Sequence, residues 1–271
     1  MALFISSLAC GMGVRRSPAS FEHAVSRFGN WIRNADGCLG LISDTASVAA
    51  ATCGVLSNAM SMAKLDFSDS PHDRRINTVN SMLSVTNGGI GAVRAVGLWS
   101  RFLSGQMFWE TGHNGEFLYK PRETLTGDAN KKIWRCPIDI ASDVSLMVAR
   151  TCSAASFLHN HQLVDLGKHA QIIGGGPLSV ACFGFAVSDA FSAASGAVAV
   201  HKGLKNYNSD SLESRKEMRS LIFGFLCDVI DIVATFVDYG LIILGGPIGM
   251  LIGSVLILFS SVLNLVRRCL G

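Results

Sequence analysis

Long apolar runs separated by short polar breaks dominate this chain, and no stretch sustains the period-two alternation of a half-buried strand. In residues 20–37 the apolar side chains recur at spacings of three and four. Ser20 is a candidate N-cap and Gly37 stands just past the expected end of this amphipathic helix. Further helices are predicted over residues 39–63, 76–103, 138–170 and 178–200, the second of them interrupted at Gly88-Gly89. The pattern therefore predicts an all-α fold, a helical bundle.

Two strongly apolar lobes, residues 221–244 and 248–266, stand near the C-terminus. A bilayer core takes about 20 residues of helix, so each lobe is long enough to cross it once. Proline has no amide hydrogen to donate and glycine is permissive in its backbone angles, which suits a tight turn. The sequence predicts a C-terminal transmembrane helical hairpin, with its turn at Gly245, Gly246 and Pro247.

Two features of the lobes bear on how they pack. Gly249 and Gly253 are four residues apart, so on a helix they face one way and admit close approach of another backbone. Asp228, Asp231 and Asp238 share one face of the first lobe. Each acid costs about 2.5–3.5 kcal/mol inside a membrane, so this face is expected to point at a partner helix, at water or towards the membrane surface.

Basic residues flank the hairpin on both sides and predict its orientation. Because lysine and arginine stay on the cytoplasmic side, both ends of the hairpin are expected in the cytosol. The organisation predicted is a helical region, 1–220, with a polar connection at 105–137, the hairpin at 221–266 and a basic cytosolic tail at 267–271. The residues that set the orientation are Lys202, Lys205, Arg215, Lys216, Arg219, Arg267 and Arg268.

Composition points towards lipid as the main partner. Of the 271 residues, 49% are hydrophobic and 16% are charged, against about 25% charged in a typical soluble domain. The net charge of +3 and the lack of a basic patch with stacking aromatics argue against nucleic-acid binding. We expect a lipid bilayer as a partner, and self-association into a homo-oligomer is left open.

Candidate chemistry is sparse. Neither glycine cluster is followed by the lysine of a phosphate-binding loop, and no nucleophile elbow is present. The loose cluster of His159, His161 and His169 lacks supporting carboxylates or thiolates and is interpreted as surface histidines. The eight cysteines form no Cys-x-x-Cys unit and are expected to be reduced. We predict no catalytic residue, metal or cofactor, and no standard signal peptide or lipid tag.

The lobes "LIFGFLCDVIDIVATFVDYGLIIL" and "IGMLIGSVLILFSSVLNLV", with a short turn, cytosolic ends, no standard signal peptide and scattered cysteines, resemble those of chlamydial inclusion membrane proteins. The resemblance implies type III secretion and insertion into the vacuole (inclusion) membrane around the bacterium, with both termini in the host cytosol. It implies a non-enzymatic effector that presents a helical region to an unidentified host or bacterial protein, for partner binding or vacuole remodelling.

A second resemblance implies an alternative function. The stretch "FLHNHQLVDLGKHAQI", the amphipathic N-terminal helix and a C-terminal hydrophobic segment are similar to the layout of the peroxisome-proliferation peroxins. Those proteins bend and elongate membranes. This resemblance implies a membrane-shaping scaffold that acts directly on lipid.

Overall fold

The fold is all-α, as predicted. A computed structural model describes residues 18–62, 71–112, 116–120, 131–175, 178–208, 211–238 and 246–270. These residues hold six α-helices: α2 (Pro18–Met62), α3 (Pro71–Leu103), α4 (Pro137–Asn160), α5 (Val180–Lys205), α6 (Leu212–Asp238) and α7 (Gly246–Leu270). They also hold two short strands, β1 (Tyr119–Lys120) and β2 (Lys131–Lys132), a 3₁₀-helix η1 (Gly167–His169) and a π-helix η2 (Gln171–Gly175).

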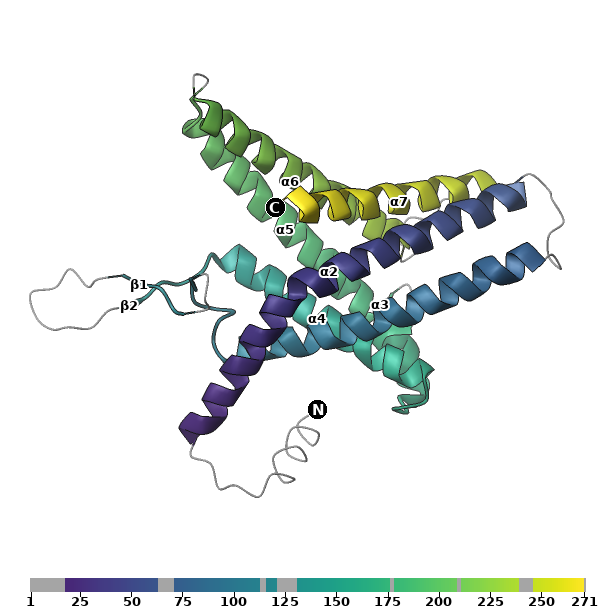
Figure 1. The fold of residues 1–271 in the computed structure, drawn as a ribbon, viewed down its shortest axis with the longest axis horizontal. Helices are drawn as coiled ribbons and strands as arrows, with labels where there is room; N and C mark the ends of the chain where they lie inside the picture. Colours follow the sequence, from purple (N-terminus) through teal and green to yellow (C-terminus); the bar gives the residue numbers. More distant parts are fainter. Residues whose placement is uncertain are drawn as a thin grey trace, which may run out of the picture.

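The six helices form a closed ring. Each helix contacts the next one along the chain, and α7 returns to contact α2 as well as α6. Figure 1 shows α7 lying along α2, with α5 and α6 side by side as a second pair. Neighbouring helices run antiparallel, so the ring has two distinct ends. The β-strands and the α5–α6 turn lie towards one end, and η1 and η2 lie towards the other, whereas the end of α7 lies against the middle of α6 and α2 (Figure 1).

Proline marks where several helices begin. Pro18, Pro71 and Pro137 are the first residues of α2, α3 and α4, because the first helical position needs no amide donor and favours the fixed φ of proline. The expected end at Gly37 was wrong: α2 continues through this glycine to Met62. A single interior glycine costs a helix only about 1 kcal/mol relative to alanine, which packing against α3 and α7 offsets.

Two other helix boundaries differ from expectation. Helix α3 runs through the Gly88-Gly89 pair without interruption. A Cβ on Gly88 would collide with the Phe157 ring of α4, so the glycine allows close packing there. Helix α4 ends at Asn160 rather than near Ala170, and the chain then forms η1 and η2. The backbone turns at Gln162, whose φ of 59° is left-handed.

The segment expected to be a polar connection contains a small β-platform. Strands β1 and β2 pair antiparallel, and isolated bridges join Trp109 to Trp134 and Thr111 to Phe117. The platform is seated on a core cluster at the junction of α3 and α4, formed by Leu98, Met107 and Met147 with Trp99, Phe102, Phe108, Val144 and Leu146 around them. The segment 105–137 is rich in polar residues, and for this reason it is expected to be an exposed connection. Its aromatic side chains nevertheless pack on the core and hold the platform in place.

Within the part of the chain that the structure describes, four helical segments are long and apolar enough to cross a membrane: Gly37–Met60, Val180–Lys205, Leu212–Val237 and Ile248–Cys269. Two of them overlap the predicted hairpin at 221–266, although Leu212–Val237 begins before it and Ile248–Cys269 ends after it, and the other two lie in the region preceding it. On α7 six exposed apolar residues recur every three or four positions and form one stripe, with Met250 exposed beside it: Ile248, Ile252, Val255, Phe259, Val262 and Val266. Helix α5 and helix α6 carry similar stripes: Val180, Phe183, Val187 and Phe191, and Ile222, Leu226, Val229 and Val233.

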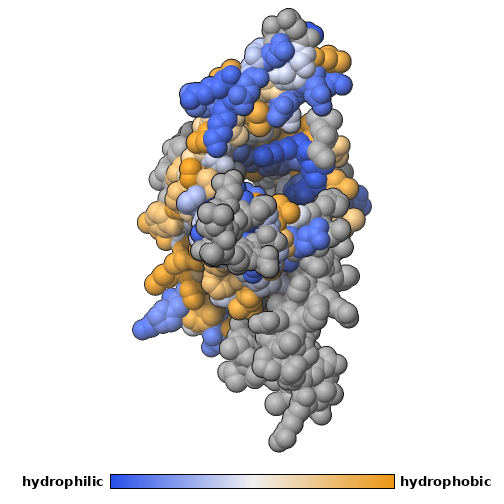
Figure 2. Space-filling view, turned by 90° about the vertical axis from the view of Figure 1, so that its left-hand side faces the viewer, coloured by the Kyte–Doolittle hydropathy of each residue, from blue (hydrophilic) through white to orange (hydrophobic). Residues whose placement is uncertain are grey.

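The distribution of hydropathy around the ring follows these stripes. Figure 2 looks onto the end that carries the strands, where hydrophobic residues cover an outer flank and hydrophilic residues gather at the top and around a central hollow. Apolar side chains therefore face outwards along the helices. Polar ones gather at this end and between the helices.

Close packing of α4 on α5 depends on a glycine, which leads to a first prediction. A Cβ on Gly184 would lie 2.8 Å from the Cβ of Ala149. Gly184→Leu should lower the free energy of unfolding by about 1–3 kcal/mol, because the two backbones must move apart. Loss of helical circular dichroism in a detergent-to-SDS titration measures this.

Gly91→Leu is the matched control, since nothing lies within 4 Å of a Cβ at that position of α3. This variant should keep or raise stability, because leucine has the better helix propensity. Equal stability of the two variants would contradict the close α4–α5 contact.

Candidate functional site: a polar cleft and the ion pairs around it

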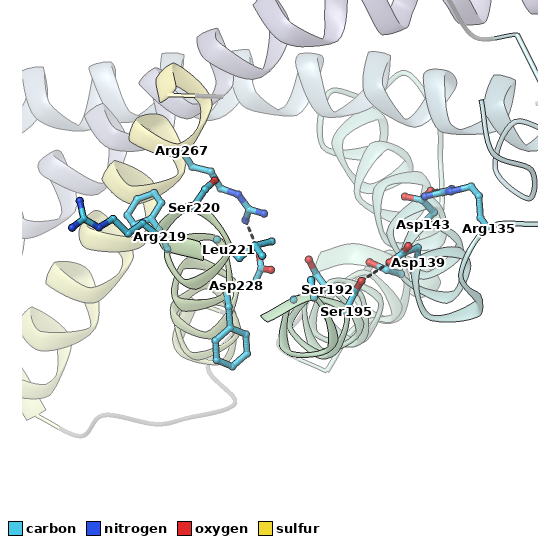
Figure 3. A pocket seen from close by; sticks show the side chains of 16 residues that line it. Arg135, Asp139, Asp143, Ser192, Ser195, Arg219, Ser220, Leu221, Asp228 and Arg267 are labelled. Carbon is cyan, nitrogen blue, oxygen red and sulfur yellow. Dashed lines mark hydrogen bonds and ion pairs between the residues drawn. The ribbon is translucent and has the colours of Figure 1, made fainter. Parts of the chain in front are cut away.

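A cleft of about 900 Å³ opens between α4, α5, α6 and the end of α7 (Figure 3). It combines charged and hydroxyl side chains with two phenylalanines. The residues that line it are Arg135, Asp139, Ser142, Asp143, Ser192, Ser195, Gly196, Ala199, Arg219, Ser220, Leu221, Phe223, Gly224, Phe225, Asp228 and Arg267. An open cleft of mixed polar and apolar lining thus lies between helices that carry apolar outer stripes.

One wall of the cleft is built on α4. Asp143 accepts hydrogen bonds from Arg101 at 3.0 Å and from Arg135 at 2.6 Å. Arg135 also donates to the carbonyl oxygen of Met107 at 2.8 Å. This arrangement ties the end of α3 and the residue just before α4 to one carboxylate. The charge of Asp143 is therefore compensated by two guanidinium groups.

The same wall is joined to α5 by hydroxyl groups. Ser195 donates to Asp139 at 2.6 Å. One turn further along α4, Ser142 donates to the carbonyl oxygen of Ser188 at 3.0 Å. Figure 3 shows Asp139 and Ser195 facing each other at the edge of the cleft. The Ser195 hydroxyl is neutral and does not compensate the charge of the Asp139 carboxylate, so this wall carries negative charge.

The opposite wall pairs α6 with α7. Asp228, whose side chain is only 9% exposed, accepts from Arg267 at 2.5 Å. A Cβ on Gly196 of α5 would lie 3.3 Å from the Asp228 carboxylate, so α5 also approaches closely here. Arg219 lines the same wall, and Figure 3 shows its guanidinium pointing away from the other labelled residues.

The remaining polar pairs lie deeper between the helices. Asp231 accepts from Ser260 at 2.5 Å and from Asn264 at 2.9 Å, both on α7. Asp189 of α5 accepts from Thr235 of α6 at 2.8 Å. Donors from a facing helix thus satisfy carboxylates that would be costly in an apolar medium. Of the three acids on the predicted acidic face of the first lobe, Asp228 and Asp231 accept hydrogen bonds from side chains of α7.

Helix α7 is joined to α2 by a second arginine. Arg268 donates to Asp44 at 2.6 Å. A Cβ on Gly40 would collide with the Arg268 guanidinium, so the glycine leaves room for this side chain. Further along, Asn58 donates to the Ser254 hydroxyl at 2.6 Å. These contacts run antiparallel along the two helices and fix their register.

The structure places the predicted hairpin residues as follows. Gly246 and Pro247 are the first residues of α7, where proline suits the start of a helix, and Gly245 lies outside the described residues. Gly249 and Gly253 are buried on α7. Asp238 is the last residue of α6, and its side chain lies outside the described part of the chain.

The predicted orientation residues divide into two groups. Arg215, Lys216 and Arg219 are exposed on the first turns of α6, beside the α5–α6 turn. Arg267 and Arg268 do not belong to a separate tail, because α7 continues to Leu270 and both guanidinium groups pair with acids of other helices. The acids of this network that sequence reasoning missed, Asp44 and Asp189, carried a usable signal: each is a lone charge in an apolar run.

The histidine cluster is not brought together around a metal. His159 accepts at Nδ1 from the amide of Leu166 at 3.2 Å, and His161 stacks edge-on against Phe157 with ring centroids 4.5 Å apart. Within the described ranges, no group of three metal-ligating side chains gathers. The described cysteines are free thiols; Cys10 lies outside these ranges.

Comparisons with known proteins returned no match: no family model, curated protein or solved structure is similar to this chain.

The Asp44–Arg268 pair generates a second prediction. Asp44→Ala and Arg268→Ala should each lower the free energy of unfolding, because the remaining charge is left half-buried without its partner. The double variant should lose less than the sum of the single losses, with a coupling of about 0.5–3 kcal/mol measured by SDS titration.

Arg219→Ala provides the control for this cycle, since it removes an exposed arginine for which no ion pair is seen in the described part of the chain. Its effect should be close to zero. Strictly additive losses in the cycle would show that Asp44 and Arg268 do not interact.

Proposed function

We propose that this chain is a non-enzymatic integral membrane protein that presents one polar end of its helical ring to the cytosol for recognition of a partner. The observation that supports this most directly is the inverted distribution of polarity. Apolar stripes cover the outer faces of α5, α6 and α7, and carboxylates are paired between helices. Exposure of those apolar stripes to water costs free energy, whereas their contact with lipid does not.

The antiparallel ring gives the proposed topology. Because successive helices run in opposite directions, the start of the first candidate span, the β-platform, the α5–α6 turn and the end of α7 all point towards one end of the ring, although the end of α7 lies against the middle of α6. The same end carries exposed basic residues: Lys120, Lys131, Lys202, Lys205, Arg215, Lys216 and Arg219. We call it the basic end. Because positive residues remain cytoplasmic, the basic end faces the cytosol in this proposal, together with the opening of the polar cleft.

This proposal changes the expected division of the chain. Residues 1–220 need not form a wholly cytosolic region, since candidate spans in α2 and α5 lie within it. Helices α3 and α4 lie between those spans in the ring. The surface offered to the cytosol is then the basic end. The sequence resemblance to inclusion membrane proteins supports a pathogen vacuole as the setting, with a host protein as the partner.

Thiol labelling tests the topology. Cys38, Cys136 and Cys269 are exposed, at the start of the first candidate span, just before α4 and at the end of α7, whereas Cys182 and Cys227 are buried. Single-cysteine variants of the full chain, in sealed vesicles, should react with a membrane-impermeant maleimide from one and the same side at positions 38, 136 and 269. Positions 182 and 227 should react only after denaturation.

Membrane integration has its own readout. The chain should resist extraction by alkaline carbonate, because interhelical pairing leaves apolar side chains in contact with lipid. Release into the soluble fraction would reject an integral membrane protein. Labelling of positions 136 and 269 from opposite sides would reject the topology alone.

A further inference from the structure

The β-platform at the basic end carries exposed aromatic and basic side chains on an ordered frame. Trp134 is 53% exposed and Tyr119 is 49% exposed, large fractions for aromatic residues. Lys120 and Lys131 are exposed beside them, and the Lys132 ammonium lies 4.0 Å above the Phe117 ring. An exposed set of this kind on an anchored frame indicates a contact surface.

Contacts within the chain itself hold the β-platform in place. Trp134 packs edge-on against Trp109, with ring centroids 4.6 Å apart, and also contacts Phe108. The amide of Arg135 donates to the carbonyl oxygen of Phe108 at 3.1 Å. Phe108 itself packs on the α3–α4 core cluster. The exposed face of the platform is thus preorganised by buried contacts behind it.

Two lysines of the platform face each other. Lys120 and Lys131 lie directly opposite each other across the antiparallel ladder. Like charges in that position destabilise a strand pair. In the described residues, no ion pair joins either lysine to a carboxylate. An anionic partner would offset this repulsion.

The position of the platform identifies the partner. It follows the end of α3 and lies towards the same end of the ring as the basic C-terminus of α5 (Figure 1). In the proposed membrane topology, this is the level at which the candidate spans leave the bilayer. Tryptophan and tyrosine concentrate at that level in membrane proteins, and lysine near anionic headgroups gains about 1 kcal/mol.

We infer that the β-platform docks on the anionic headgroup region of the membrane, with Trp134 and Tyr119 at the interface and Lys120 and Lys131 on lipid phosphates or carboxylates. This inference rests on the proposed membrane topology. Docking would fix the height of the polar cleft relative to the membrane surface, since Arg135 belongs to both the platform and the cleft wall.

Depth-dependent quenching tests the inference. The full chain, with Trp31, Trp99 and Trp109 replaced by phenylalanine, is reconstituted in phosphatidylcholine vesicles with and without phosphatidylserine. Lipids brominated close to the headgroup should quench Trp134, and phosphatidylserine should increase the quenching. Added salt should reverse that increase, because it screens the lysines.

Lys120→Glu is the decisive variant. It places opposite charges across the ladder, so the platform should remain folded or become more stable. It should nevertheless weaken the phosphatidylserine-dependent docking by about fivefold for each unit of charge removed. Lys202→Glu makes the same charge change at the end of α5 and should leave Trp134 quenching unchanged.

Three outcomes would overturn the inference. The first is that aqueous iodide quenches Trp134 and brominated lipids do not. The second is that Lys120→Glu shows the same dependence on phosphatidylserine as the parent chain. The third is that a soluble acidic peptide shifts the emission of Trp134 and phosphatidylserine does not. The last would assign the surface to a protein partner. In each case continued resistance to carbonate extraction would leave the proposed function standing.

Discussion

The closure of the helical ring by α7 depends on two adjacent arginines that point to different helices. Arg267 binds Asp228 of α6 and Arg268 binds Asp44 of α2. Successive residues on a helix project about 100° apart, so an arginine pair can reach both neighbours of the helix that carries it. Without these pairs, each acid would be left in a mostly apolar setting. The contacts along α2 and α6 place the other polar groups of α7, Ser254, Ser260 and Asn264, opposite their partners.

The same closure separates the polar from the apolar surfaces. Because the acids and their donors lie between helices, the outer faces are free to be continuous apolar stripes. An apolar medium strengthens such pairs, since no water competes for the donors. Helices that contain these acids can therefore lie in a membrane, because each acid is paired with a donor on a neighbouring helix. It also explains why the cleft is polar although four of the helical segments are long and apolar enough to cross a membrane.

The ring also gathers distant segments at one end. The β-platform follows α3 and the α5–α6 turn follows α5, so they are alternate connections of the ring, and the end of α7 points the same way. An antiparallel order with an even number of helices brings alternate connections to the same side. The basic end thereby combines an aromatic platform, exposed lysines and the mouth of the cleft, a set of groups that no single segment offers.

The sequence by itself determined the helical class, since long apolar runs without a period of two leave no alternative. It also placed α6 and α7, because apolarity over a bilayer length is a local property. It did not determine that α2 passes through Gly37, because a glycine's local cost is small beside the packing of a long helix. Nor did it reveal the platform, whose aromatic residues pack on α3 and α4.

Only the tertiary structure decided which charges meet. Asp44 and Arg268 are separated by most of the chain, and no local pattern relates them. The apolar stripe of α7 showed that one face is buried or in lipid, but left open which helices its polar face contacts. Ridges and grooves on apolar helices are alike, so helix pairing is set by the few positions where polar groups must match. Those matches, at Asp228, Asp231 and Asp44, exist only once the ring has closed.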